Sequence, residues 1–209
     1  MPVPTEPRNI AALPRDHTGK PVPWFAAWLD GVPDFRVVGP GKTADAVRLG
    51  LCWVCGGPAG SYKAFVAGPR CGSNRNSAEP PAHRDCAVYS AQACPFLAVP
   101  HMRRRENNLP EGARDPAGIA IKRNPGITLV WITKSYRVER TPDGPLFAFG
   151  DPVEVLWYAH GRPATRAEVE ESIRTGMPLL RVEAERDGPG AVAELEEMAA
   201  DFTPLLPAA

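Results

Sequence analysis

Two short motifs contain the residue types that bind a soft divalent metal ion. Cys52 and Cys55 are separated by two residues and are followed directly by Gly56, and His83 and Cys86 repeat the two-residue spacing further along the chain. A Cys-x-x-Cys pair followed by glycine folds into a tight turn, which we call the knuckle. Both sulfurs then converge on one point and backbone amides face them, which favours thiolates and hence a metal such as zinc.

The second pair is expected at the start of a helix. Two prolines at 80–81 give a rigid entry to this helix, and Pro95 prevents it from continuing further. His83 and Cys86 lie three residues apart in the first turn, so their side chains face the same way. We therefore predict a tetrahedral metal site with four ligands: Cys52, Cys55, His83 and Cys86.

This ligand set predicts a structural Zn²⁺ ion, because four protein ligands leave no coordination position for water or substrate. Structural zinc contributes on the order of 10–16 kcal/mol of apparent folding free energy, enough to hold a proline-rich segment with little core. Unbound buried cysteines and a disulfide are the alternatives, and the cytosol disfavours a disulfide. Cys71 is an alternative to His83 as the fourth ligand, whereas Cys94 is expected in the core.

The elements around this site are short, because the chain holds 25 prolines and 19 glycines. Residues 1–22 are predicted to form an extended, proline-rich arm. The spacing of Trp24 and Trp28 predicts a short helix with both indoles on one side. We assign 23–105 to a zinc-binding module and 106–125 to a linker or long loop.

Residues 126–209 are predicted to form an antiparallel β-sheet followed by C-terminal helices. The β-branched run at 127–133 is typical of a strand covered on both faces. A hairpin at 136–149 and a strand at 153–158 are expected to complete the same sheet.

Helical periodicity replaces the strand pattern after Pro163. Thr165 and Glu168 have the spacing of a capping box, which predicts the start of a helix. Gly176 is expected to end this helix, and Pro178 to begin another. A final helix near 191–202 is predicted to lay an apolar stripe on the sheet. The expected fold class is α+β.

The order knuckle, hairpin and ligand-bearing helix over about 50–95 resembles a treble-clef zinc finger. We therefore expect a small treble-clef-like unit packed with the antiparallel sheet and the C-terminal helices. Treble clefs include metal-dependent nucleases, whose water-activating histidine lies on the hairpin. No histidine occurs between Cys55 and His83, so a nuclease is the least favoured function.

At whole-chain level, several segments resemble a family of proteins encoded by phages and prophages of GC-rich bacteria. The resemblance implies a setting, the host cytoplasm during phage gene expression, and implies no mechanism. The segments that carry it are Leu51–Gly56, Pro80–Cys86, Cys94–Leu97 with Met102–Arg105, and Gly161–Thr165.

The chain has 209 residues, 24 Lys+Arg against 24 Asp+Glu, and 44% hydrophobic residues. These values are typical of a soluble globular protein and exclude a wholly disordered chain. No window approaches the roughly 18 consecutive apolar residues of a membrane span, and no secretory signal is recognisable at the N-terminus. We therefore expect a cytoplasmic protein with no membrane partner.

The charges are unevenly distributed along the chain. Residues 1–160 hold 19 basic and 14 acidic side chains, whereas 161–209 hold 5 and 10. Within 52–105 the basic residues greatly outnumber the acidic ones, which is the pattern of a phosphate-binding surface and predicts DNA or RNA as a partner. The candidate nucleic-acid-binding residues are Arg70, Arg75, Arg84, Arg103, Arg104 and Arg105.

A host or phage protein is the alternative partner, favoured by the Trp24 and Trp28 pair and by the acidic C-terminal helices. No Ser/His/Asp or paired-carboxylate grouping is recognisable, so a non-enzymatic binding protein is favoured over an enzyme. The sequence leaves the oligomeric state open.

Overall fold

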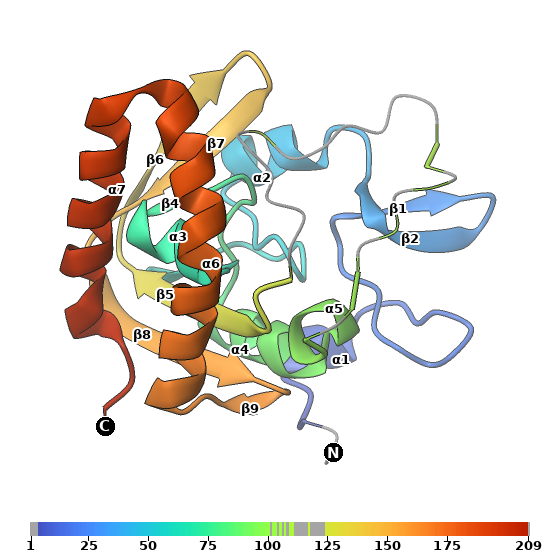
Figure 1. The fold of residues 1–209 in the computed structure, drawn as a ribbon. Coiled ribbons are helices and arrows are strands. Elements are labelled where there is room, and N and C mark those ends of the chain that lie inside the picture. The colour runs from blue at the N-terminus through green and yellow to red at the C-terminus, as the bar shows by residue number, and fades with distance from the viewer. Residues whose placement is uncertain are drawn as a thin grey trace.

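The computed structural model describes most of the chain as an α+β fold built from three antiparallel sheets and several helices (Figure 1). This confirms the predicted class, with antiparallel strands and C-terminal helices. None of the described helices is long and apolar enough to cross a membrane. The residues described are 4–208, except 101, 104, 106, 108, 111–116 and 118–123. The predicted linker at 106–125 therefore lies mostly outside them.

A four-stranded sheet forms the centre of the molecule, with the strand order β3-β5-β8-β9. Every residue of β5 is buried, as its β-branched sequence predicts for a strand covered on both faces. Side chains alternate along the strand, so β5 contributes to a separate core on each face. The strands are β3 (Lys63–Ala67), β5 (Ile127–Thr133), β8 (Pro152–Ala159) and β9 (Arg162–Pro163).

The first core lies between one face of this sheet and the cysteine-rich segment. Val130 and Ile132 from β5 pack here with Cys52, Val54 and residues of α4 (Arg84–Ala93). α4 ends at Ala93, as Pro95 predicts, and a short helix, α5 (Pro95–Ala98), follows it.

The second core lies on the opposite face and is closed by a second sheet and by helices. Leu129 and Trp131 from β5 pack here with Phe147 and Phe202. The hairpin of β6 and β7 pairs with β4 instead of joining the central sheet, so the prediction of one main sheet is wrong. The elements are α3 (Pro69–Ser73), β4 (Asn76–Ser77), β6 (Tyr136–Thr141), β7 (Gly144–Phe149), α6 (Arg166–Asp187), α7 (Pro189–Phe202) and the 3₁₀ turn η1 (Thr203–Leu205).

The two cores share strands from both halves of the chain. β3 belongs to the predicted zinc-binding module at 23–105, yet it pairs with β5, which belongs to the predicted unit at 126–209. The described parts of the two segments therefore form one sheet and do not separate into two units. A long-range strand pairing of this kind leaves no local signal in the sequence, because it depends on the partner strand.

The helix α6 begins at the predicted capping box and runs further than predicted. Thr165 Oγ1 accepts a hydrogen bond from the Glu168 N–H, and the Glu168 carboxylate accepts one from the Thr165 N–H. The helix does not end at Gly176, and it continues through Pro178 to Asp187. Packing of α6 against α7 along its length (Figure 1) overrides the local glycine and proline signals.

The N-terminal residues 4–22 fold onto α4 as a strap. The short helix α1 (Arg8–Ala11) places Ile10 in the first core with only 1% of its surface exposed, and Val22 is also buried. The prediction of an extended arm over 1–22 is therefore wrong for this strap. The high proline content gave no local signal for this single turn of helix, because the turn is stabilised by packing of Ile10 in the first core.

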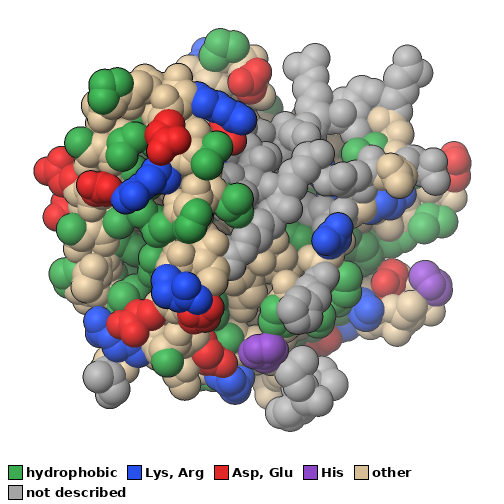
Figure 2. All heavy atoms as spheres, viewed as in Figure 1, with side chains coloured by type: hydrophobic (Ala, Val, Ile, Leu, Met, Phe, Trp, Pro, Cys, Tyr) green, Lys and Arg blue, Asp and Glu red, His purple; other side chains and the backbone are tan. Residues whose placement is uncertain are grey.

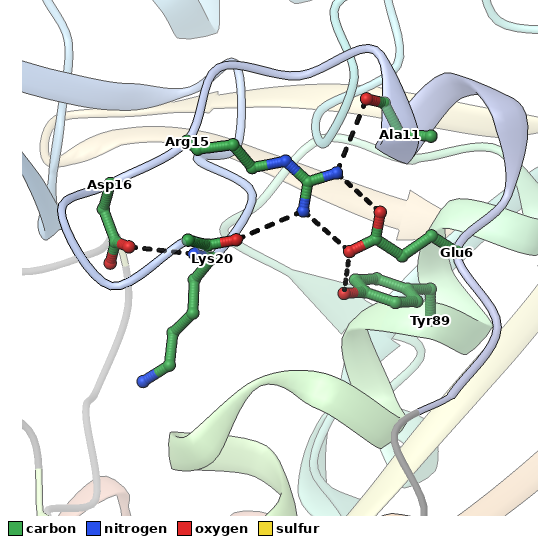
Figure 3. Close-up of polar contacts among 7 residues, drawn as sticks. Glu6, Ala11, Arg15, Asp16, Lys20 and Tyr89 are labelled. Atoms are coloured by element: carbon green, nitrogen blue, oxygen red, sulfur yellow. Dashed lines mark hydrogen bonds and ion pairs between the residues drawn. The ribbon is translucent and has the colours of Figure 1, made fainter.

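An ion-pair network holds the strap closed (Figure 3). Arg15 donates hydrogen bonds to both carboxylate oxygens of Glu6, at 2.7 and 2.6 Å, and a further one to the backbone carbonyl of Ala11. The Tyr89 hydroxyl of α4 donates to the same carboxylate at 3.3 Å. The Glu6 carboxylate therefore links the two ends of the strap to the helix beneath it.

The segment after the strap also differs from the sequence prediction. β1 (Ala26–Leu29) and β2 (Val32–Val38) form a hairpin that pairs with neither of the other sheets, so the predicted helix at Trp24 and Trp28 is wrong. Asp30 and Gly31 both have positive φ, which closes the two-residue turn between the strands. α2 (Lys42–Leu49) follows the hairpin and ends at Gly50.

The burial of Ile10 gives a direct test of the strap. Replacing Ile10 with alanine is expected to lower the free energy of unfolding by about 3 kcal/mol, because it leaves a cavity in the first core. Urea denaturation measures this change. Arg8→Ala, on the exposed side of the same helical turn, is the control and should change stability by less than about 0.5 kcal/mol. Equal effects of the two substitutions would contradict a packed strap.

Candidate metal centre

The knuckle is shaped by backbone hydrogen bonds within its own turn. The Cys52 N–H donates to the Gly57 carbonyl at 2.8 Å, and the Gly56 N–H donates to the Cys52 carbonyl at 2.8 Å. The Cys55 N–H faces the Cys52 sulfur at 3.5 Å. Gly56 has a φ of +72°, a conformation that favours glycine, which explains why glycine follows the second cysteine.

The second ligand pair reaches the knuckle through β3 and the start of α4. Ala64 and Ala82 exchange two backbone hydrogen bonds of 2.9 and 2.8 Å, and this bridge fixes the entry to α4. The Trp53 N–H donates to the Pro81 carbonyl at 3.0 Å, which ties the knuckle to the same segment. The hairpin expected between the knuckle and the helix is thus represented by this single bridge, and α3 and β4 lie between Ala64 and Ala82 in the sequence.

The four predicted ligands meet at one point. His83 is the N-cap of α4 and Cys86 lies in its first turn, as predicted. The ligand atoms of Cys52, Cys55, His83 and Cys86 all lie within 4.8 Å of one another. Such a cluster of three sulfurs and one imidazole could hold a metal ion, with each residue offering one ligand atom.

The imidazole of His83 is oriented for binding through Nδ1. Its Nδ1 lies 3.3 Å from the Cys55 sulfur and 3.8 Å from the Cys86 sulfur, whereas Nε2 lies 2.9 Å from the Pro58 carbonyl oxygen. Because a carbonyl only accepts, Nε2 carries the hydrogen and donates it to Pro58. The Nδ1 lone pair is then free to bind a metal, as in the usual outer-shell support of metal-binding histidines.

The site is closed towards the protein and partly open to solvent. Cys52 and Cys86 are both 0% exposed, while Cys55 and His83 are half-buried. Cys71 lies in α3 and Cys94 forms the C-cap of α4, and neither belongs to the cluster found among the described residues. The described structure therefore favours His83 over Cys71 as the fourth ligand.

Hydrogen bonds between the sulfurs and burial shift the pKa values of the three cysteine thiols in opposite directions. A hydrogen bond from the Cys86 thiol is the largest of the effects that lower the pKa of Cys52 to about 5, and the Cys55 and His83 backbone N–H groups add to it. The same hydrogen bond and burial raise the pKa of Cys86, and burial raises the pKa of Cys55. The site thus holds one thiolate and two thiols near neutral pH.

Three of the six arginines predicted to bind nucleic acid form ion pairs with carboxylates. Arg84 donates to both oxygens of Glu154 in β8, at 2.7 and 2.8 Å. Arg75 pairs with Asp151 at 2.9 Å and lies over the Trp131 ring.

The other four members of the predicted set differ in what surrounds them. Arg105 forms an ion pair with Asp34 of β2. Arg70 is the basic residue in the last turn of α3, and its side chain is half-buried. Arg103 is exposed, and Arg104 lies outside the described residues.

Counting charges within 52–105 missed these pairs, because the acidic partners Asp34, Asp151 and Glu154 come from other parts of the chain. The predicted basic surface therefore carries less unpaired positive charge than the count of basic residues in the sequence indicates. Over α6 and α7, basic and acidic side chains are likewise intermixed (Figure 2).

Comparison of the chain with protein-family models, with curated proteins and with solved structures finds no match. The resemblance to proteins of phages and prophages stays a prediction, and so do the functions expected from the sequence. What can be said about function therefore rests on the geometry of the cysteine cluster and of the surfaces around it.

The proton distribution at the cluster predicts a steep pH dependence of metal binding. Metal ligands must be deprotonated, so binding displaces the protons of Cys55 and Cys86 but none from Cys52. Each released proton changes the apparent association constant about tenfold per pH unit, so we expect it to rise about 100-fold between about pH 7 and pH 8. Competition with a chromophoric chelator measures this slope. A slope near zero would contradict the assigned ligands.

Proposed function

We propose that this chain is a non-enzymatic binding protein whose fold is stabilised by one structural Zn²⁺ ion. The observation that carries the proposal is the closed set of four converging ligands, Cys52, Cys55, His83 and Cys86. With all four positions of a tetrahedron filled by protein, the ion has no position for a water molecule to activate. The ion would then stabilise the fold and perform no reaction.

The donor set supports zinc over the other common metals. Thiolates select soft or borderline ions, while Mg²⁺ and Ca²⁺ prefer oxygen ligands. Tetrahedral sites with three cysteines and one histidine are typical of zinc. The hydrogen bond from His83 to Pro58 adds the outer-shell contact expected of a resident metal.

The expected role of the ion is to join two segments that few other contacts hold together. Cys52 and Cys55 precede β3, and His83 and Cys86 open α4. The cysteine side of the first core is made largely of small residues such as alanine. A structural zinc ion supplies folding free energy on the order of 10–16 kcal/mol, which offsets the small apolar area buried there.

Substitution of the ligands tests the structural zinc ion. We expect purified wild-type protein to hold about one zinc per chain by elemental analysis, and the Cys52→Ser and Cys86→Ser variants to lose both the metal and the cooperative thermal transition. Cys94→Ser, at a cysteine outside the cluster, is the matched control and should keep the metal. A fully folded, metal-free wild-type protein would refute the proposal.

We infer that the partner is a protein and that it binds the β1–β2 hairpin. The hairpin exposes five large apolar side chains, each 39–59% exposed, and hydrophobic side chains are visible at this projecting edge in Figure 2. Trp28 pairs with Pro33 on one face of the hairpin and Leu29 pairs with Val32 on the other, so apolar side chains are exposed on both faces. Exposed apolar groups collected on one projecting element are typical of a protein interface. The five residues are Trp28, Leu29, Val32, Phe35 and Val38.

Nucleic acid remains the second candidate from the charge distribution, but the ion pairs of Arg75, Arg84 and Arg105 weigh against it. Phosphate binding would have to compete with these carboxylates. A nucleic-acid-binding protein would give an affinity for oligonucleotides that falls steeply with salt, and substitution of Arg103 and Arg105 by alanine would weaken it for every sequence.

Affinity capture with matched variants distinguishes the two partners. From phage-infected or lysogenic cells, after nuclease treatment, we expect wild-type protein to retain a stoichiometric protein that the Trp28→Ser/Phe35→Ser variant loses. Val182→Ser, which changes an apolar side chain of similar exposure on α6, is the control and should retain it. Loss from both variants, or salt-sensitive oligonucleotide binding in a polarisation assay without any captured protein, would contradict a protein partner.

A further inference from the structure

The root of the β1–β2 hairpin connects it to the rest of the molecule. Among the described residues its strands pair only with each other, and the hairpin projects on the side of the molecule opposite α7 (Figure 1). The ion pair between Arg105 and Asp34 is a further contact, and Arg105 is half-exposed, so it contributes little. The residues that precede β1 and follow β2 are the ones that connect the hairpin to the knuckle.

The residues that precede β1 pack on the knuckle itself. Trp53 lies between the two knuckle cysteines, and the Phe25 ring stacks on it with centroids 4.9 Å apart and planes 11° apart. The Trp24 and Trp53 rings make an edge-to-face contact with their centroids 6.4 Å apart, and the Trp24 backbone N–H donates to the Val54 carbonyl at 2.7 Å. Both aromatic residues at the root thus rest on the four-residue turn that carries two of the metal ligands.

The fit between Trp24 and the knuckle is close. A Cβ atom at Gly56, the residue after Cys55, would lie 2.4 Å from the Trp24 ring. The Trp53 indole N–H is buried without a hydrogen-bond partner among the described residues, so ring contacts alone orient this side chain. A small change in the shape of the turn would therefore separate these rings.

The residues that follow β2 also contact the aromatic pair at the root of the hairpin. The Gly39 N–H, one residue after β2, donates to the Phe25 carbonyl at 2.8 Å. The Lys42 ammonium at the start of α2 lies 4.1 Å from the centroid of the Trp24 ring. Both ends of the hairpin are therefore fixed to the aromatic pair that rests on the knuckle.

The shape of the knuckle depends in turn on what occupies the cluster. Apart from the ligands, it is tied to the α4 segment by the hydrogen bond from Trp53 to Pro81 and by the contact of the His83 N–H with the Cys52 sulfur, at 3.2 Å. A bound ion would cross-link the knuckle to the start of α4 through two ligands on each side, and its removal takes this cross-link away. Loss of the ion is expected to open the turn.

We propose that the metal centre positions the β1–β2 hairpin, so that its exposed apolar side chains are held in place for the protein partner only while the ion is bound. This rests on the proposed metal binding and adds a regulatory role for the same site. Metal occupancy shifts the hairpin between a fixed state, seated through Trp24, Phe25 and Trp53, and a loose state. The centre then acts on binding without touching the partner.

Hydrogen exchange of the full chain, with zinc as the probe, tests this coupling. On zinc removal by a chelator we expect amide exchange in 26–38 to rise on the order of tenfold or more, while exchange in the β6–β7 hairpin at 136–149 changes on the order of twofold or less. Elemental analysis of the same samples reports zinc content separately. If the chain binds zinc but exchange in 26–38 does not change when the zinc is removed, the coupling alone is overturned. If the chain binds no zinc, the proposed function is overturned.

A variant keeps the test decisive if the metal-free chain unfolds throughout. Trp53→Ala retains all four ligands and removes the seat of the hairpin. We expect it to bind about one zinc per chain and, with zinc bound, to show fast exchange in 26–38 and unchanged exchange in 136–149. Trp28→Ala, which removes an exposed tryptophan of the hairpin itself, is the control and should exchange like wild type outside the substituted strand. Slow exchange in zinc-loaded Trp53→Ala would overturn the proposal.

Discussion

The convergence of three sulfurs and one imidazole is the constraint on which the surrounding structure depends. It brings the knuckle to the start of a helix some thirty residues later. The hairpin root packs on the knuckle, the strap packs on the helix, and β3 runs between the two ligand pairs before entering the central sheet. Under the proposed function, a metal ion at this point would cross-link these segments.

The central strand β5 connects the cysteine side of the molecule to the helical side. Its fully buried residues face the cysteine side and the helical side alternately, so one strand connects two cores that would otherwise be independent. The second core is rich in large aromatic side chains, and Trp131 and Trp157 each donate a hydrogen bond to a backbone carbonyl. This side of the sheet is therefore held by large buried rings and their hydrogen bonds, while the other side carries the Cys/His cluster.

The surface electrostatics follow from pairs that are distant in sequence. Arg84 and Glu154 are 70 residues apart and Arg75 and Asp151 are 76 apart, yet each pair forms direct hydrogen bonds. A cationic segment in the sequence is thus partly neutralised in the fold. The exposed apolar side chains of the β1–β2 hairpin are left as the more distinctive surface feature.

The sequence by itself predicted the two Cys/His pairs and the elements whose signals are local, while the fold favoured His83 over Cys71 in the cluster. Cys-x-x-Cys-Gly, His-x-x-Cys at a helix start, the β-branched run of β5 and the capping box at Thr165 each depend on residues within a few positions of one another. Only the tertiary structure decided the strap, the β1–β2 hairpin and the passage of α6 through Pro178. In each of these, contacts with distant residues outweigh local propensity: Ile10 with the first core, Phe25 with Trp53, and α6 with α7.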